Sequence, residues 1–366
     1  MSDMMEYKCP ACGGTMEFDS TLQKMKCPYC DTVMTVEEFQ EIQKKEQEKH
    51  KERMTESTSD HNTDAANMWG EGETDSMNVY ACQSCGGEIV VDETTGATTC
   101  PFCGNRVVMK EKFSGDLRPD YIIPFKKDKK AAKEAYYDHL KGKKFLPKLF
   151  KDENHIDEIK GVYVPFWLYD IDVEAEINYE GERVAATWRT GDKQYTKHEV
   201  YSVERQGTDH YEHVPADGSK NMEDALMESI EPFNFKDAVP FEPAYLAGYI
   251  ADRYDVDQKT RLERVKERVT KSTEAAFQNT VTGYTTLRQV NSNVDIRNIK
   301  TSYALYPVWV LSTTWKDKNY IFAMNGQTGA LIGDLPMDKG EYKKFIAIRT
   351  AIIGVILAIA LILLCM

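Results

Sequence analysis

The sequence predicts a multidomain fold: two small four-cysteine zinc β-ribbons, an α+β domain with an antiparallel sheet, and a single C-terminal transmembrane helix. Three observations predict it: a four-cysteine pattern that occurs twice in the first 103 residues, strand-like alternation from residue 161 onward, and a nearly uncharged apolar C-terminus. The 366 residues are enough for two or three domains. The expected segments are zinc ribbon 1 (1–34), a charged helix and flexible linker (35–78), zinc ribbon 2 (79–110), a basic strand–helix segment (111–160), the α+β domain (161–340) and the transmembrane tail anchor (345–366).

The two cysteine modules share one spacing, C-x2-C-x14-C-x2-C. The first set is Cys9, Cys12, Cys27 and Cys30, and the second is Cys82, Cys85, Cys100 and Cys103. Two cysteines separated by two residues reach one metal from a single tight turn, and two such turns complete the tetrahedron that zinc prefers. The 14 residues between the pairs leave room for two short strands. Each module is therefore predicted to be a zinc ribbon.

All four ligands of each predicted site are thiolates, so no position stays open for water or substrate. We therefore expect two structural Zn²⁺ ions, which stabilise modules too small to build a sufficient core. A four-thiolate site also binds iron, so the sequence leaves zinc and iron open. Redox catalysis by the Cys-x-x-Cys pairs is disfavoured, because the sequence around them does not suggest a βαβ unit.

The segment 161–336 is expected to form the α+β domain. Strands are expected over 161–181, 183–191, 194–207, 284–296, 301–315 and 318–335, with a turn at 190–193. Short helices are expected over 222–230 and 244–254, and an amphipathic helix over 260–277. A Pro-x-Trp sequence occurs twice, ending at Trp167 and Trp309. It indicates either an aromatic binding wall or two strands that pack tryptophan into a common core, and we favour the core.

The C-terminal segment 345–366 contains a single charge, Arg349. As a helix, its 22 residues would span roughly 33 Å, compared with about 30 Å of bilayer hydrocarbon. Lys343 and Lys344 precede it, so the positive-inside rule places residues 1 to about 344 in the cytoplasm. The expected location is the cell membrane, with the membrane as a partner through this single helix.

The net charge of −13 disfavours nucleic acid as a general partner. Between Arg106 and Lys151, however, 14 Lys and Arg residues stand against 6 Asp and Glu residues, a local charge of +8. The remainder is −13 − 8 = −21. Segment 106–151 is therefore a candidate contact surface. The sequence leaves open whether it binds anionic lipid, nucleic acid or neither.

The cysteine modules resemble the zinc ribbons of transcription factor TFIIB and of the primosomal replication-restart helicase. A broader resemblance runs through "YKCPACGG", "IKGVYVPFWLYD", "DALMESIEPF" and "FAMNGQTGALIGDLP". It is to uncharacterised tail-anchored zinc-ribbon proteins of Firmicutes, some of which carry TFIIB-type or helicase-like labels. The resemblance implies zinc binding and a membrane location but no known activity. The helicase label does not transfer, because the sequence has no nucleotide-binding loop.

No catalytic constellation is recognisable in the sequence, so we do not expect an enzyme or a small-molecule substrate. Carboxylates alternate from Asp170 to Glu176, as on a solvated strand face. The expected function is that of a membrane-anchored, zinc-binding interaction or scaffold protein with protein partners. The alternative is a membrane-tethered zinc-ribbon protein that binds nucleic acid.

Overall fold

The computed structural model describes residues 9–11, 15–42, 69–70, 73–74, 77–92, 99–112 and 117–365, with side chains described for all of these except 92, 111–112 and 358–365. The strands are β1 (Glu17–Asp19), β2 (Lys24–Lys26), β3 (Val33–Met34), β4 (Met77–Cys82), β5 (Glu88–Asp92), β6 (Val107–Lys112), β7 (Tyr121–Ile122), β8 (Lys160–Thr190), β9 (Lys193–Asp217), β10 (Val239–Pro240), β11 (Ile250–Asp252), β12 (Thr286–Trp315), β13 (Lys318–Asn325) and β14 (Leu331–Gly333). The α-helices are α2 (Lys129–Leu140), α3 (Glu153–Ile156), α4 (Asp224–Ser229), α5 (Gln258–Asn279) and α6 (Lys339–Cys365), with a further helical segment at 36–42. The 3₁₀ helices are η2 (Lys148–Lys151), η3 (Phe235–Asp237) and η4 (Pro243–Leu246).

One large sheet dominates the described residues. Its strand order is β10-β7-β12-β8-β11-β5-β4-β6, with β9 added to β8, and with β13 and then β14 added to β12. The strands β1, β2 and β3 form a separate small sheet. The large sheet is built around β8, β9 and β12, which are 31, 25 and 30 residues long. The predicted turn at 190–193 is confirmed, because β8 ends at Thr190 and β9 begins at Lys193.

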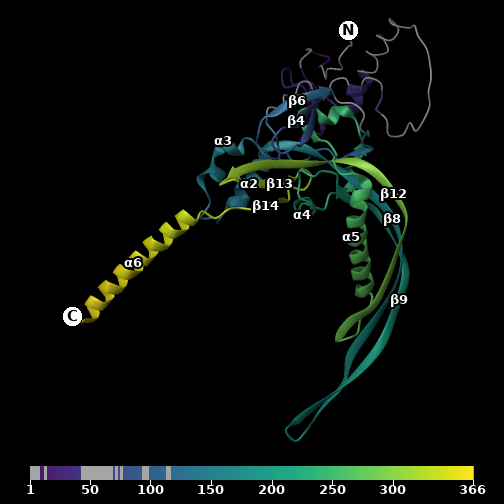
Figure 1. Ribbon diagram of the computed structural model, residues 1–366, viewed down its shortest axis with the longest axis vertical. Coiled ribbons are helices and arrows are strands. Elements are labelled where there is room, and N and C mark those ends of the chain that lie inside the picture. Colours follow the sequence, from purple (N-terminus) through teal and green to yellow (C-terminus); the bar gives the residue numbers. More distant parts are fainter. Residues whose placement is uncertain are drawn as a thin grey trace.

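The outer parts of β8, β9 and β12 form a long curved arm that leaves the body of the molecule (Figure 1). In β8, every second residue from Ile171 to Gly181 is buried, as the two-residue period of a strand requires. The helix α5 lies on the inner side of this curve (Figure 1), with Phe277 packed against a cluster that includes Ile177 and Tyr179. The predicted amphipathic helix over 260–277 is confirmed by α5.

The two tryptophans of the Pro-x-Trp repeat lie in the same hydrophobic core. The indole Nε1 of Trp167 donates to the carbonyl oxygen of Val256, and that of Trp309 donates to the carbonyl oxygen of Lys127, each at 2.8 Å. Both indoles are buried, at 3% and 7% exposure. The interpretation of these residues as core rather than as a binding wall is confirmed.

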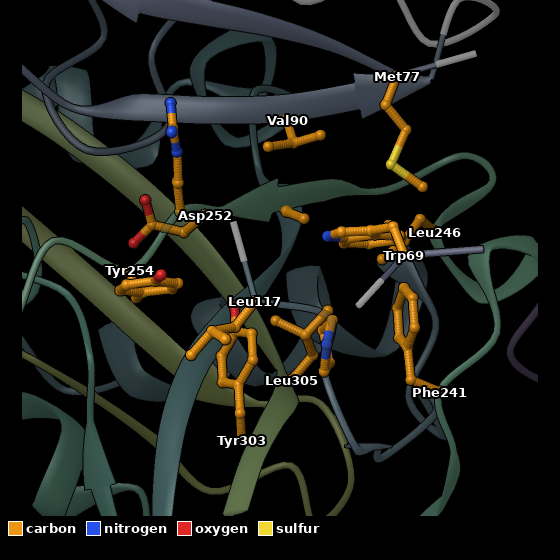
Figure 2. A pocket seen from close by; sticks show the side chains of 13 residues that line it. Trp69, Met77, Val90, Leu117, Phe241, Leu246, Asp252, Tyr254, Tyr303 and Leu305 are labelled. Atoms are coloured by element: carbon orange, nitrogen blue, oxygen red, sulfur yellow. The ribbon is translucent and has the colours of Figure 1, made fainter. Parts of the chain in front are cut away.

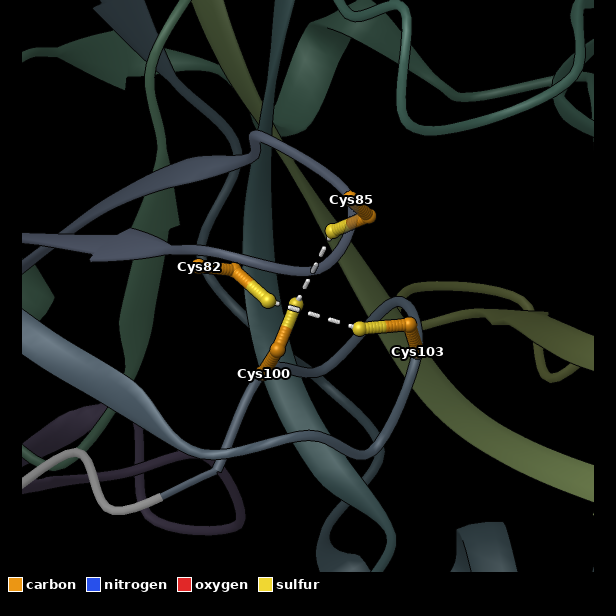
Figure 3. Close-up of side chains that lie close together, drawn as sticks. All are labelled: Cys82, Cys85, Cys100 and Cys103. Carbon is orange, nitrogen blue, oxygen red and sulfur yellow. Dashed lines mark hydrogen bonds between the residues drawn. The ribbon is translucent and has the colours of Figure 1, made fainter.

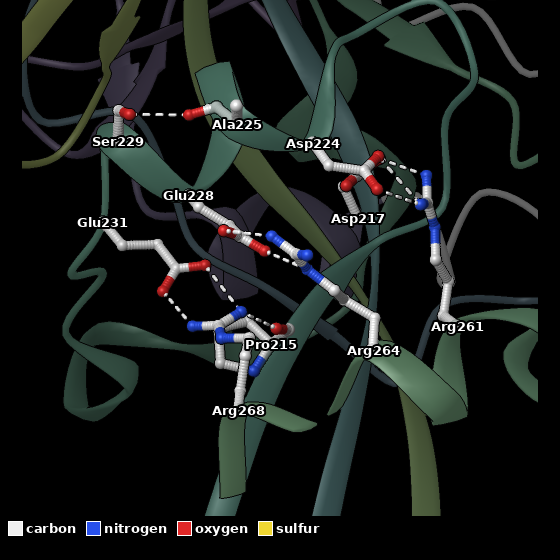
Figure 4. Close-up of polar contacts among 10 residues, drawn as sticks. All are labelled: Pro215, Asp217, Asp224, Ala225, Glu228, Ser229, Glu231, Arg261, Arg264 and Arg268. Carbon is white, nitrogen blue, oxygen red and sulfur yellow. Dashed lines mark hydrogen bonds and ion pairs between the residues drawn. The ribbon is translucent and has the colours of Figure 1, made fainter. Parts of the chain in front are cut away.

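Three arginines on one face of α5 hold α4 and the turn after it (Figure 4). The ion pairs are Arg261–Asp224, Arg264–Glu228 and Arg268–Glu231, with N···O distances of 2.8, 2.9 and 2.6 Å. Spacings of three and four residues place the arginines on one side of the helix. Burial raises the pKa of Glu231, and Arg268 offsets this only in part. The predicted short helix over 222–230 is confirmed by α4.

The segment 244–254 differs from the helix expected there. Its only helical part is the last three residues of the single turn η4, and Gly248 then adopts a positive φ of 83°, a conformation that ends a helix. The chain continues as the strand β11. This strand runs parallel to β8 at Tyr163↔Ala251 and antiparallel to β5 at Val90↔Ala251. The second cysteine module is thereby joined to the central sheet.

The prediction of a transmembrane helix over 345–366 is wrong. The helix α6 extends away from the body (Figure 1), but among the described residues no helix is long and apolar enough to cross a membrane. Five charged residues fall between Lys339 and Arg349, in the first part of this helix.

This finding corrects three expectations together. The predicted fold class included a membrane-spanning segment, whereas the described structure is mostly a sheet. The predicted membrane partner and the predicted single-pass cell-membrane location rested on the same segment, and they are overturned by the same finding.

Candidate metal centres

Two tight turns of the second cysteine module bring its cysteines together. In the first turn, the Cys82 N–H donates to the Gly87 carbonyl at 2.9 Å, and the Gly86 N–H donates back to the Cys82 carbonyl at 2.9 Å. The second turn repeats this pattern, with the Cys100 N–H donating to Asn105 and the Gly104 N–H donating to Cys100. Each turn therefore places its two thiols on one side of the backbone.

The four sulfur atoms converge on one point (Figure 3). The Sγ atoms of Cys82 and Cys103 are 3.5 Å apart, and those of Cys85 and Cys100 are 3.6 Å apart. A disulfide would need about 2.05 Å. A tetrahedral metal with sulfur ligands at about 2.3 Å has sulfur–sulfur edges of about 3.8 Å. The spacing therefore fits a metal ion held by four thiolates, and this group can hold one.

The thiols of this group have unequal acidities. Burial raises the pKa of Cys82, but backbone N–H groups of Cys85 and Ser84 outweigh it and bring the pKa down to about 7. Burial raises the pKa of Cys85 to about 11 and raises that of Cys100 further. A divalent metal favours the thiolate form of each ligand, so binding displaces protons from the buried thiols.

Residues outside the cysteine pattern support the site. The Asn105 Nδ2 lies 3.5 Å from the Cys103 Sγ and donates to the Ser84 hydroxyl at 3.0 Å, which links the two turns. Lys160 donates to the carbonyl oxygen of Thr99 at 2.6 Å, next to Cys100, whose charge acts on the lysine. Asn105 could have been found from the sequence, because it lies two residues after the last cysteine of the motif. Lys160 could not, because its contact with Thr99 spans 61 positions.

The second module is also fixed to the body by charged groups. The Glu88 carboxylate at the start of β5 pairs with Arg253 at 2.8 Å and with Lys110 of β6 at 2.6 Å. Pairing with Lys110 is the main reason that the pKa of Glu88 is lowered. The module is therefore packed on the sheet on one side, while Cys85 on the other side is exposed.

The first module repeats the arrangement in part. The Sγ atoms of Cys9, Cys27 and Cys30 lie close enough to hold a metal ion, with Cys9 and Cys30 at 3.6 Å. Its second turn has the hydrogen bonds of the other module, from the Cys27 N–H to Thr32 and from the Asp31 N–H to Cys27. The predicted fourth ligand, Cys12, lies outside the described residues.

This module packs against the body through β1. Phe18 contacts Tyr245 edge to face at 5.1 Å, and the Phe18 N–H donates to the Ala247 carbonyl at 3.4 Å. The structure therefore brings together seven of the eight predicted cysteines in two groups. The modules that hold them contact one segment of the body, through β1 at Tyr245 and Ala247 and through β5 at β11.

Figure 2 shows a small pocket beside β11 that the sequence did not predict. It has a volume of about 30 Å³ and is lined mainly by apolar and aromatic side chains, among them Trp69, Leu117 and Tyr303. Asp252 also lines it and is only 2% exposed. Burial raises the pKa of Asp252 well above its usual range, and the Ser219 side chain offsets this only in part. Neither carboxylate oxygen of Asp252 has a hydrogen bond of good geometry among the described residues.

These features define a β-rich protein with two cysteine groups able to hold metal ions. The chain is 31% identical over 338 residues to the uncharacterized protein YdjG of Bacillus subtilis (strain 168), and the match covers 92% of each chain. The protein therefore belongs to the same family as YdjG. No family model and no solved structure matches the chain. The narrower resemblance to TFIIB-type zinc ribbons stays a prediction.

Proposed function

We propose that the protein is a non-enzymatic interaction protein in which two structural zinc ions stabilise the cysteine modules. The observation that carries this proposal is the group of four sulfurs around one point, with Cys82 and Cys100 buried. Four thiolates fill the coordination sphere of zinc, so such a site stabilises a fold rather than binding a substrate. We favour zinc over iron because a purely structural site needs no redox chemistry.

The small size of the cavities beside two buried carboxyl groups of the body supports a structural rather than a catalytic role. Burial raises the pKa of Asp217 to about 7, and that of Asp252 is raised as well, which is a property of many active sites. The two cavities that they line, however, have volumes of only about 30 and 10 Å³, room for about two water molecules and for one. Asp217 is also paired with Arg261 at 2.9 Å. A substrate does not fit in either cavity.

The alternative is nucleic-acid binding through the cysteine modules and segment 106–151. Support for this contact surface is weaker, because several of its lysines are paired with carboxylates. The pairs are Lys126–Asp237, Lys133–Asp157 and Lys141–Asp138, with N···O distances of 2.6, 2.5 and 2.5 Å. The arm, by contrast, offers a long exposed surface that an interaction protein can use.

The proposal is tested by metal analysis of the full chain purified without added metal. We expect close to two zinc ions per chain and a colourless protein, whereas iron–thiolate centres absorb visible light. The variant C85S/C103S is expected to retain one zinc, and removal of zinc by a strong chelator is expected to lower the urea midpoint. The proposal fails if the purified protein holds no metal, or if chelation leaves its stability unchanged.

A further inference from the structure

The end of the arm is a bare two-stranded ribbon. The pairing of β12 with β8 stops at Thr286↔Glu182, and beyond this point β8 pairs only with β9. We call residues 184–198 the arm tip. All of its residues are exposed. From Val184 to Thr190 it extends by about 20 Å at the rise of a β-strand, and Figure 1 shows it as the part of the arm farthest from the body.

The arm tip carries a pair of half-exposed aromatic side chains. Trp188 and Tyr195 face each other across the ribbon, with ring centroids 5.8 Å apart and an interplanar angle of 15°. Such a cross-strand pair stabilises a hairpin. Stacking nevertheless leaves the two side chains 49% and 44% exposed, with no helix or third strand beneath them. This is a large aromatic surface for a part of the molecule that has no core of its own.

Cations surround this aromatic pair. Lys193 and Lys197 lie on the same face as Tyr195, because strand residues two apart share a face, and Arg189 lies on the other face. Among the described residues, neither Arg189 nor Lys193 forms an ion pair, whereas Lys197 shares Glu199 with Arg183 at the base of the arm tip. Both faces of the ribbon therefore present positive charge to the solvent.

The charge of the arm tip is opposite to that of the rest of the chain. Residues 184–198 contain three Lys and Arg residues and one Asp, a net charge of +2, and the remainder is −13 − 2 = −15. Arg189 lies seven residues beyond Glu182, the last carboxylate of β8, or about 23 Å of strand. The Debye length is about 8 Å at physiological salt, so the arm tip presents its own positive potential to a partner.

We propose that the arm tip is a binding element for duplex DNA that enters the major groove. The inference rests on the proposed function, since it names a partner for an interaction protein, and it places the DNA contact on the arm tip instead of on the cysteine modules and segment 106–151. A B-form major groove, about 12 Å wide, admits a two-stranded β-ribbon, whereas the major groove of A-form RNA is too narrow. Arg189 on one face and Lys193 on the other reach phosphates on the two sides of the groove, and Trp188 and Tyr195 contact sugars and thymine methyl groups.

The test measures fluorescence anisotropy of a labelled duplex of about 20 base pairs with the zinc-loaded full chain, from about 50 to 300 mM salt. The test variants are R189E/K193E and W188A/Y195A. The matched control is K259E/K271E, which makes the same charge change at two exposed lysines of α5. We expect R189E/K193E to weaken binding at least tenfold at low salt and to reduce the salt slope by about two, while the control stays within twofold of wild type.

Three results would overturn the inference. One is the absence of duplex binding at the lowest salt, and another is equal binding by R189E/K193E and K259E/K271E. The third is preferential binding to the single strand, to anionic vesicles or to a second copy of the chain, measured in parallel by cosedimentation and light scattering. Zinc content and the urea midpoint are measured on the same preparations. If the protein is folded and zinc-loaded but does not bind DNA, this inference alone is refuted. If the purified protein holds no metal, the proposed function is refuted.

Discussion

The Asn319 side chain on β13 donates a 2.7 Å hydrogen bond to the carbonyl oxygen of Phe102, a residue 217 positions earlier in the chain. Phe102 lies between Cys100 and Cys103, inside the turn that supplies two of the four sulfurs. Its side chain is 2% exposed and belongs to the hydrophobic cluster of the central sheet. The geometry of the second cysteine group is therefore coupled to the packing of a strand far away in sequence.

We expect Asn319→Leu to destabilise the protein by about 1–3 kcal/mol, because it leaves the carbonyl of Phe102 without its donor. Zinc should also transfer several-fold faster to a chromogenic chelator. The control is Ser312→Ala, which removes a 2.8 Å hydrogen bond to the Oδ1 of Asn319 but keeps the bond to Phe102. Equal rates of zinc transfer for the two variants would contradict the coupling.

Lys160 is expected to tune the metal affinity of the second group. Four thiolates around Zn²⁺ leave an excess of two negative charges, and this partly buried ammonium group lies beside Cys100. Lys160→Met should weaken zinc binding about tenfold, the lower end of the range for residues that support metal ligands. Competition with a chelator of known affinity measures the change.

Lys160→Arg is the matched variant, since it keeps the positive charge with a different shape. We expect it to recover part of the lost affinity. If Lys160→Met and Lys160→Arg weaken binding equally, the lysine acts through its hydrogen bond to Thr99 and not through its charge.

The local parts of the fold were predictable because their signals lie within short stretches of sequence. The cysteine spacing indicated the two modules, and alternation indicated β8 and β9 with the turn between them. The pairing of β5 with β11 was not predictable, because the backbone pairing of Val90 with Ala251 does not depend on which side chains the two residues carry. The segment around β11 also contains apolar residues at helical spacing, which favour a helix. Its pairing with the neighbouring strands makes it a strand instead.

The candidate site was predictable at the level of its ligands and no further. The spacing of the cysteines predicted the two cysteine groups. The contacts of Lys160 and Asn319 were not predictable, because they span 61 and 217 positions. The arm tip was visible only as a hairpin. Its exposure depends on where β12 begins, at Thr286, and the sequence of β8 does not contain that information.

Gly86 tests the backbone conformation of the metal-binding turns. It follows Cys85 with a φ of 79°, and an added Cβ would meet no atom within 4 Å. The penalty of Gly86→Ala is therefore conformational alone, and we expect about 1–2 kcal/mol from urea denaturation of the zinc-loaded protein. Gly86→Asn should be milder, since asparagine tolerates this conformation better.

Asp31 provides the comparison in the first module. It follows Cys30 with a φ of 57°, as Gly104 follows Cys103 in the second module with a φ of 73°. Asp31→Gly is expected to relieve strain there, so it should not destabilise the protein beyond the loss of its exposed ion pair with Lys26. If Gly86→Ala is neutral, the positive φ is not required by the turn.

Asp217 should make the stability of the protein fall as the pH rises. Its carboxylate is 5% exposed, and the Arg261 that pairs with it at 2.9 Å also serves Asp224. Burial therefore outweighs the pairing and raises the pKa to about 7, compared with 3.8 for the unperturbed group. A carboxyl group whose folded pKa is raised stabilises the fold at low pH, and this contribution is lost as the pH rises from about 4 towards 7.

Asp217→Asn removes this titration and keeps a side chain of the same shape. Between pH 6 and pH 8, wild type should lose about 1 kcal/mol of stability relative to the variant. The difference between their urea midpoints, measured with zinc bound at both pH values, isolates this group from all others that titrate. Asp192→Asn, which removes a carboxylate from the exposed turn of the arm, is the control and should run parallel to wild type. If the midpoint of Asp217→Asn also runs parallel to wild type, Arg261 holds Asp217 ionised throughout, and the ion pair dominates over burial.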